Sequence, residues 1–159
     1  MASNFYLKLD NIDGESRDTD HPKEIEILDF SFGVSNTGSR HTGSGGGSGQ
    51  AHLQDINFTK FADRSTPILM QYCVTHKDIP NATITCYKAA GETRVKYLVI
   101  KLKEVIVTSY QTGGGDGIAM ESGALNFAEI KYTYSEQKTD QAAGGPVEWA
   151  YNIPEHKAK

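Results

Sequence analysis

The segment Thr93–Gln111 (TRVKYLVIKLKEVIVTSYQ) constrains the fold of this chain more than any other. It is rich in β-branched and aromatic residues and alternates between apolar and polar positions, which is typical of a β-strand. Its core of about 17 residues would extend roughly 55 Å at 3.3 Å per residue. A compact domain of this length is only roughly 40 Å across. We therefore predict that this strand bends, coils around a barrel or projects beyond the body.

The rest of the chain also alternates with the period of a β-strand. The predicted strands are Asn4–Leu9, Glu24–Val34, Ala51–Phe58, Asn81–Lys88, Thr93–Gln111, Gly123–Ser135 and Pro146–Ile153. In Glu24–Val34 the apolar residues change face after Ile27, which predicts a bulge or bend there. Together these segments indicate about seven or eight strands.

A single helix is predicted after Arg64. Ser65 and Thr66 offer a capping hydroxyl, and Pro67 suits the first helical turn. Apolar residues then recur on one face, and the helix should end near Lys77. The fold class is therefore mainly β: a small β-barrel or sandwich of seven or eight strands with one α-helix packed at its side.

Composition indicates one domain over residues 1–159, without a nucleic-acid or membrane partner. The net charge is −4 and the pI about 5.7, whereas a nucleic-acid-binding domain shows a basic stripe. The first ten residues have no apolar core of a signal peptide, and the longest aliphatic run is three residues, so neither conventional export nor membrane insertion is expected. Cys73 and Cys86 are expected to be buried free thiols, with a disulfide as the alternative.

Residues 35–50 (SNTGSRHTGSGGGSGQ) form a long loop with six glycines and no apolar side chain. Most connections in compact domains are about 4–6 residues long, and longer ones are usually functional or disordered. No Gly-Lys pair supports a phosphate-binding loop, Ser48 stands where a dinucleotide fingerprint needs its third glycine, and no nucleophile elbow fits. We expect a flexible loop, or one that a partner orders. A second mobile loop is expected at 111–120, where Gly113–Gly117 forms a hairpin tip.

The sequence predicts no catalytic residues, no metal site and no cofactor. Leu9–Asp20 resembles a calcium-binding loop only superficially, because its first position is Leu9 and its last is not glutamate. His21 with Asp18 and Asp20 could form an acid–base cluster on folding, but a solvated polar turn is the more common structure for such a group. The other histidines match no metal-binding spacing.

Several stretches occurring in order along nearly the whole chain resemble the haemolysin-coregulated protein (Hcp) family, the tube subunits of type VI secretion systems. They are Ile12–Ser16 with Asp18 and His21, Glu24–Leu28, His41–Gly49, Asp63–Pro67 with Leu69 and Met70, Tyr97–Leu102 with Val105, Val107 and Ser109, and Phe127, Ile130, Thr133 and Tyr134. The tail after Pro146 matches least well.

The resemblance implies a tail-tube-like β-barrel without catalytic activity, which assembles into hexameric rings. The rings would stack into a hollow tube that a contractile sheath expels. The implied partners are further copies of the chain, the sheath, spike and baseplate proteins of the machine, and small effector proteins carried in the lumen. The implied location is the bacterial cytoplasm and, after export through the type VI system itself, the extracellular space.

Two sets of interface residues follow from this hypothesis. The glycine-rich loop would contact the next ring through Arg40, His41, Thr42, Gly43, Ser44, Gly45, Gly46, Gly47 and Gln50. The long strand, whose edges we expect to be open, would contact a neighbouring subunit through Tyr97, Val99, Lys101 and Lys103. The alternatives are a bacteriophage tail-tube protein, a monomeric β-barrel whose loops 35–50 and 111–120 cover a small-molecule site, and an enzyme of unrecognised type.

Overall fold

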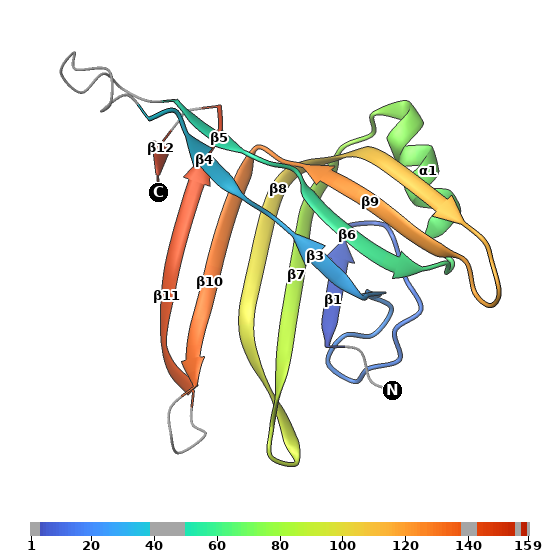
Figure 1. The fold of residues 1–159 in the computed structure, drawn as a ribbon, viewed down its shortest axis with the longest axis horizontal. Helices are drawn as coiled ribbons and strands as arrows, with labels where there is room; N and C mark the ends of the chain where they lie inside the picture. Colours follow the sequence, from blue (N-terminus) through green and yellow to red (C-terminus); the bar gives the residue numbers. More distant parts are fainter. Residues whose placement is uncertain (1–3, 39–49, 138–142, 155–156, 159) are drawn as a thin grey trace.

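The structure, a computed structural model, describes residues 4–38, 50–137, 143–154 and 157–158. These residues contain twelve strands and one helix, α1 (Thr66–Thr75), between β6 and β7 (Figure 1). The strands are β1 (Phe5–Leu9), β2 (Ile25–Ile27), β3 (Asp29–Ser31), β4 (Val34–Asn36), β5 (Ala51–Leu53), β6 (Ile56–Phe61), β7 (Ile79–Ala90), β8 (Thr93–Gly113), β9 (Met120–Asn126), β10 (Glu129–Gln137), β11 (Ala143–Asn152) and β12 (Lys157–Ala158).

The long predicted strand is β8, and it bends from one sheet into another. Its first half pairs with β7 and β10, in a sheet ordered β12-β11-β10-β8-β7-β1-β2, which we call sheet A. Its second half pairs with β9, which continues through β6 to β3, and we call these strands sheet B. Between the halves Glu104 has a φ of 52°, and a bulge follows between Val107 and Ser109. The predicted bend is confirmed, and the β7–β8 hairpin also projects beyond the body (Figure 1).

A second corner lies between β2 and β3, where the sequence predicts a bend. β2 pairs with β1 in sheet A, whereas β3 pairs with β6 in sheet B. Leu28 lies at the corner and donates its backbone N–H to the carbonyl of Thr59 at 2.8 Å. Among the described strands the hydrogen-bonded order does not close into a ring. The body is therefore two sheets joined in a barrel-like way at the two corners where strands change sheets, which agrees with the predicted small barrel or sandwich with a helix at its side.

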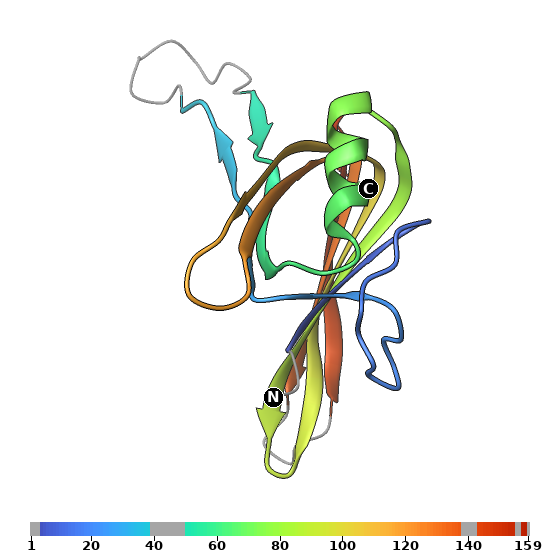
Figure 2. The ribbon, with the colours of Figure 1, turned by 90° about the vertical axis from the view of Figure 1, so that its right-hand side faces the viewer.

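The core fills the space between the two sheets. Leu7, Ile84 and Ile100 from sheet A and Phe58 from sheet B are fully buried. Helix α1 lies beside the sheets at one end of the body (Figure 2) and buries Leu69 and Tyr72. Both cysteines are free thiols, so the disulfide alternative is wrong; Cys86 is buried, and burial raises the pKa of its thiol to about 12.

The helix begins where predicted, but the capping group is different. The Ser65 side chain makes no capping hydrogen bond to the helix. Instead, Asp63 accepts a hydrogen bond from the Ser65 backbone N–H at 2.8 Å, and its own N–H donates to the Thr66 hydroxyl at 3.1 Å. This reciprocal pair satisfies donors that a helix start leaves without partners. α1 ends at Thr75, because His76 takes a left-handed conformation with a φ of 53°.

Short strands raise the strand number above the predicted seven or eight. The predicted strand Glu24–Val34 divides into β2, β3 and the start of β4, and Ala51–Phe58 divides into β5 and β6. β4 and β5 pair only with each other and form a two-stranded ribbon that extends away from the body (Figures 1 and 2). In the part of the chain that the structure describes, no helix is long and apolar enough to cross a bilayer.

Candidate assembly surfaces

Sheet A is wider than the layer that covers it, so its apolar face continues uncovered onto β10 and β11. Leu98 on β8 lies opposite Tyr134 on β10, which lies opposite Val147 on β11. Along this row the exposed fraction rises from 5% for Leu98 to 42% for Tyr134 and 69% for Val147. Trp149, in the next row, is 36% exposed and stacks on Tyr151. We call Tyr134, Val147 and Trp149 the apolar overhang.

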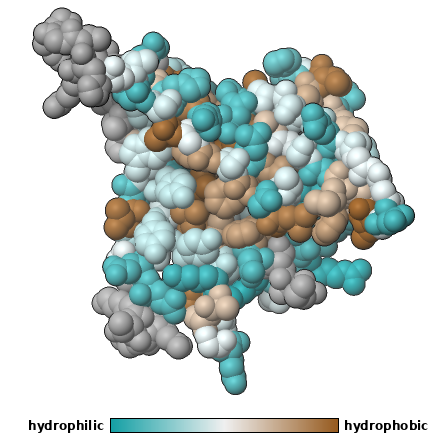
Figure 3. All heavy atoms as spheres, viewed as in Figure 1, coloured by the Kyte–Doolittle hydropathy of each residue, from teal (hydrophilic) through white to brown (hydrophobic). Residues whose placement is uncertain are grey.

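The overhang continues toward the root of the β4–β5 ribbon. A shallow hollow of about 250 Å³ is lined by Phe32, Val34, Tyr132 and Trp149. Val34 is exposed, although it is apolar. The space-filling view, seen from the same side as Figure 1, shows hydrophobic atoms exposed across the middle of this face (Figure 3). Contiguous exposed apolar surface of this kind marks interaction sites.

The opposite end of sheet A carries a groove with a mixed lining. This groove, of about 600 Å³, lies beside β2; its apolar lining includes Phe5, Ile27, Leu28 and Phe61, and its polar lining includes Glu15, Glu26 and Asp63. Leu28 and Phe61 are exposed. Since β2 and β11–β12 are the two ends of the strand order, the groove and the apolar overhang lie at opposite sides of the same sheet.

Most of the predicted ring-contact loop lies outside the described residues. Arg40, His41, Thr42, Gly43, Ser44, Gly45, Gly46 and Gly47 fall within 39–49. Gln50 is described: it is exposed and donates its backbone N–H to the Thr37 hydroxyl at 3.0 Å. The described stem shows that the loop is carried at the end of the β4–β5 ribbon.

The expectation that the long strand has open edges holds for only part of the strand. Leu98–Lys103 of β8 is paired on both sides, with β7 along one edge and with β10 along the other. Among the described strands, Ile106–Gly113 pairs with β9 alone. Lys101 and Lys103 are exposed on the polar face of sheet A, and Tyr97 and Val99 are half-buried. Among the described residues, the outer edge of β11 pairs with another strand only at Tyr151 and Asn152. Free edges therefore remain on β11 and on the second half of β8.

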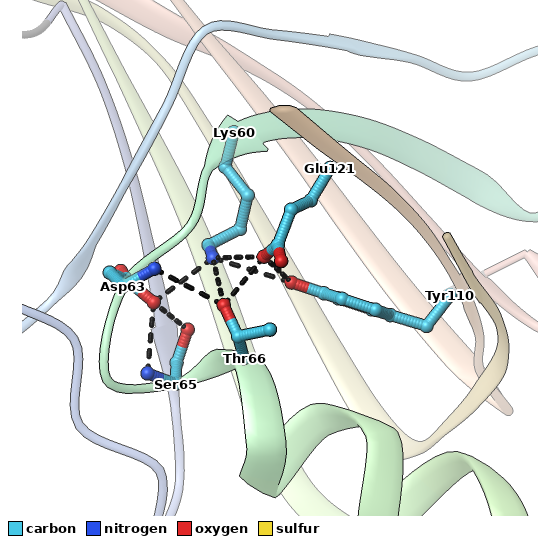
Figure 4. Close-up of polar contacts among 6 residues, drawn as sticks. All are labelled: Lys60, Asp63, Ser65, Thr66, Tyr110 and Glu121. Atoms are coloured by element: carbon cyan, nitrogen blue, oxygen red, sulfur yellow. Dashed lines mark hydrogen bonds and ion pairs between the residues drawn. The ribbon is translucent and has the colours of Figure 1, made fainter. Parts of the chain in front are cut away.

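A buried ionic network joins the start of α1 to sheet B (Figure 4). The Lys60 ammonium is fully buried and lies 2.9 Å from Glu121 and 3.0 Å from Asp63. Glu121 also accepts hydrogen bonds from Thr66, at 2.6 Å, and from Tyr110. Burial by itself raises the pKa of Glu121, but these hydrogen bonds outweigh burial and hold the pKa below its ordinary value.

In the structure, His21, Asp18 and Asp20 do not form the acid–base cluster that the sequence allowed. The His21 ring is buried between other groups, with Nδ1 2.9 Å from Glu24 and Nε2 2.6 Å from the Tyr87 hydroxyl. Asp18 pairs with Arg94 at 2.5 Å instead. These contacts fasten the loop between β1 and β2 onto the outer face of sheet A.

The calcium-loop resemblance also has a structural explanation. Asn11 takes a left-handed conformation with a φ of 66° at a tight turn, where the Ile12 N–H donates to the Leu9 carbonyl at 3.3 Å. Gly14 lies so close to the neighbouring strand that a Cβ would stand 2.5 Å from the Glu24 carbonyl oxygen. Among the described residues, no cluster of three or more His, Cys, Asp or Glu side chains could hold a metal ion.

Sequence reasoning missed the apolar overhang. The alternation of Val147 and Trp149 predicts a strand with both side chains on one face, but not whether that face is covered. The structure shows that the described residues leave Val147 and Trp149 exposed. Three independent comparisons with known proteins bear on the role of such a surface.

The family model described as "Type VI secretion system effector, Hcp" matches residues 6–134. Among curated proteins, Protein hcp1 of Pseudomonas aeruginosa is 45% identical over 156 residues, covering 96% of each chain. Among solved structures, one described as a type six secretion system protein has a TM-score of 0.91 at 29% identity, covering 99% of this chain and 100% of the other.

Two further solved structures are also similar to this chain. Hcp1 from Salmonella typhimurium has a TM-score of 0.83 at 30% identity, with 100% of both chains covered. A type VI secretion system effector from Yersinia pestis has a TM-score of 0.76 at 26% identity, covering 94% of this chain and 100% of the other. The sequence match over most of the chain and the shared two-sheet fold lead to one conclusion: this chain belongs to the Hcp family of type VI secretion tube proteins.

Proposed function

We propose that this chain is the subunit of a hexameric ring and that its rings stack into the tube of a type VI secretion system. The observation that carries the proposal is the apolar overhang at one end of sheet A, together with the groove at the other end, where Leu28 and Phe61 are exposed. Complementary surfaces on opposite sides of one subunit form heterologous contacts, and such contacts close into rings when the rotation permits. A tryptophan and a tyrosine at the centre of the overhang suit a stable interface.

We further propose that ring stacking uses the loop on the β4–β5 ribbon. Its contacts would come from Arg40, His41, Thr42, Gly43, Ser44, Gly45, Gly46, Gly47 and Gln50. Support comes from the described stem of the loop, the β4–β5 ribbon, which extends away from the body of the subunit. The contact would be weak in isolation, because ordering a glycine-rich loop costs entropy.

Four β8 residues remain predicted subunit contacts: Tyr97, Val99, Lys101 and Lys103. Since Val99, Lys101 and Lys103 have strand partners on both sides inside the chain, contacts through these three residues must be made by side chains and not by strand pairing. The remaining proposals are the sheath, spike and baseplate proteins as partners, effector proteins in the lumen, and export from the bacterial cytoplasm through the machine itself. We propose no catalytic role: the charged clusters at Lys60 and His21 are engaged in contacts that hold the fold.

The test is native mass spectrometry of the purified chain with negative-stain imaging of the same sample. We expect a species of six times 17.4 kDa and annular particles. A chain that stays monomeric at high concentration would contradict the proposal and favour the monomeric binding module.

Stacking is tested separately with Gly45, Gly46 and Gly47 changed together to alanine. We expect rings that no longer stack. The matched control changes Gly113, Gly114 and Gly115, around which an added Cβ meets nothing within 4 Å, and it should stack as the unmodified chain does. Unchanged stacking of the variant with Gly45, Gly46 and Gly47 changed to alanine would show that the loop makes no stacking contact.

A further inference from the structure

The polar face of sheet A carries a row of three lysines, of which Lys101 and Lys131 lie directly opposite each other. Lys8 on β1 lies opposite Thr83 on β7, Thr83 lies opposite Lys101 on β8, and Lys101 lies opposite Lys131 on β10. Ile100 and Leu102 beside Lys101 are buried in the core, so Lys101 points to the opposite face. All three lysines are exposed. We call Lys8, Lys101 and Lys131 the lysine row.

This arrangement is unfavourable for the chain alone. Residues directly opposite each other on antiparallel strands have Cα atoms about 4.5–5.5 Å apart. Like charges at such positions destabilise a sheet. Lys131 has a half-exposed Glu148 carboxylate at 3.4 Å, but among the described residues neither Lys8 nor Lys101 has a carboxylate within 4.0 Å. Among the described residues, the exposed ammonium of Lys101 is therefore open to an acidic partner.

The row lies beside a groove and not on a flat surface. A groove of about 400 Å³ is lined by Lys101, Lys103 and Lys131 and by two glutamates, Glu129 at 3.8 Å from Lys103 and Glu148 at 3.4 Å from Lys131. Lys8 lies outside this groove, farther along the same face of sheet A. The residue opposite Lys131 on β11 is Ala150, whose small side chain leaves the groove open at that end. At the β1 end, the loop that carries His21 covers the face only around Tyr6 and Tyr87.

We infer that this groove binds an acidic protein segment through the lysine row. The charge complementarity is local, since the chain as a whole carries a net charge of −4. Glu129 and Glu148 would repel the continuous phosphates of a nucleic acid, but a protein segment can set its carboxylates against the lysines and its hydrogen-bond donors against the glutamates. The inference rests on the proposed carriage of effector proteins. It specifies that the effector surface that contacts sheet A is acidic.

The test uses a fluorescein-labelled peptide of twelve glutamates with the full chain, and an equivalent glutamine peptide and single-stranded RNA as comparison probes. We expect binding of the glutamate peptide that weakens as salt rises, because exposed charges are screened. Changing Lys8, Lys101 and Lys131 together to glutamine should weaken binding about tenfold, since each exposed pair contributes little alone. The matched control changes Arg17, Arg64 and Lys96 to glutamine, which removes the same charge elsewhere, and should bind within about twofold of the unmodified chain.

Three results would overturn the inference: no binding of the glutamate peptide, equal loss in both variants, or tighter binding of RNA than of the peptide. Native mass spectrometry of the same samples separates this inference from the proposed function. If the unmodified chain is hexameric but does not bind the glutamate peptide, the proposed ring stands and the proposed acidic partner is rejected. Loss of the hexamer only in the lysine variant would assign the row to the subunit interface and not to a partner.

Discussion

At the scale of single residues, the bend in β8 depends on one unusual backbone conformation. Glu104 has a φ of 52°, a left-handed conformation that costs a non-glycine residue about 1–2 kcal/mol. Glu104→Gly should leave the free energy of unfolding equal or slightly higher, and Glu104→Val should lower it by about 1–2 kcal/mol. Urea unfolding measures both, and Lys103→Val, in ordinary extended backbone, is the control that should change little. Equal effects of valine at the two positions would contradict the assigned strain.

Gly14 illustrates a different constraint, a close approach of two backbones. A Cβ there would lie 2.5 Å from the Glu24 carbonyl oxygen, whereas one at Gly115 meets nothing within 4 Å. Gly14→Ala should therefore lower the free energy of unfolding by about 1–3 kcal/mol. Thermal unfolding of Gly14→Ala beside Gly115→Ala measures this, and a similar melting temperature for the two variants would contradict it.

At the scale of elements, the Lys60 network fastens α1 to sheet B. Replacing one partner leaves a buried charge without compensation, so Lys60→Met should destabilise the fold by about 3–5 kcal/mol. The double change Lys60→Met with Glu121→Leu should cost less than the sum of the single changes, because the two charges compensate each other. Chemical unfolding of the four proteins in this cycle measures the coupling, and strict additivity would show that the pair does not interact.

The same network predicts the response to acid. The pKa of Glu121 is lowered below its ordinary 4.5 in the folded chain, so its ionisation stabilises the fold above that pH and the stabilisation is lost as the pH falls through the lowered pKa. Glu121→Gln should show a flatter loss of stability between neutral pH and acid. Melting temperatures across this range measure it, and parallel curves for the two proteins would rule out the contribution of Glu121.

Elements also show how far the sequence could predict the fold. The phase change after Ile27 and the length of Thr93–Gln111 predicted both corners, because period and extension are local properties. The pairing of Leu98–Lys103 on both sides could not be predicted, since strand partners depend on contacts distant in sequence. The contact in which Asp63 accepts a hydrogen bond from the Ser65 backbone N–H could not be read from the capping pattern of Ser65 and Thr66. Whether the apolar face of β11 is covered depends on the width of sheet B. The local sequence of β11 carries no information about that width.

At the scale of the whole molecule, the stability of the subunit should depend on its assembly. If the apolar overhang is covered in a ring, the apparent melting temperature rises with protein concentration, since association stabilises the folded state. Trp149→Asp should abolish rings and this concentration dependence, while the isolated fold persists because Trp149 packs at the surface. Val74→Asp, on the exposed side of α1, is the control and should keep both. A concentration-dependent melting temperature in Trp149→Asp would place the interface elsewhere.

The free edge of β11 has a consequence for chains that remain unassembled. An exposed strand edge offers its backbone donors and acceptors to any other strand, and natural proteins normally cover such edges. Here the edge lies beside the apolar overhang. An unassembled subunit therefore exposes both an unpaired strand edge and an apolar surface, which together favour non-specific β-pairing. Closure of a ring would satisfy these groups and limit their reactivity at the same time. Production of the chain in excess of its partners should therefore be limited by its solubility, and rapid oligomerisation would protect the pool of subunits from aggregation.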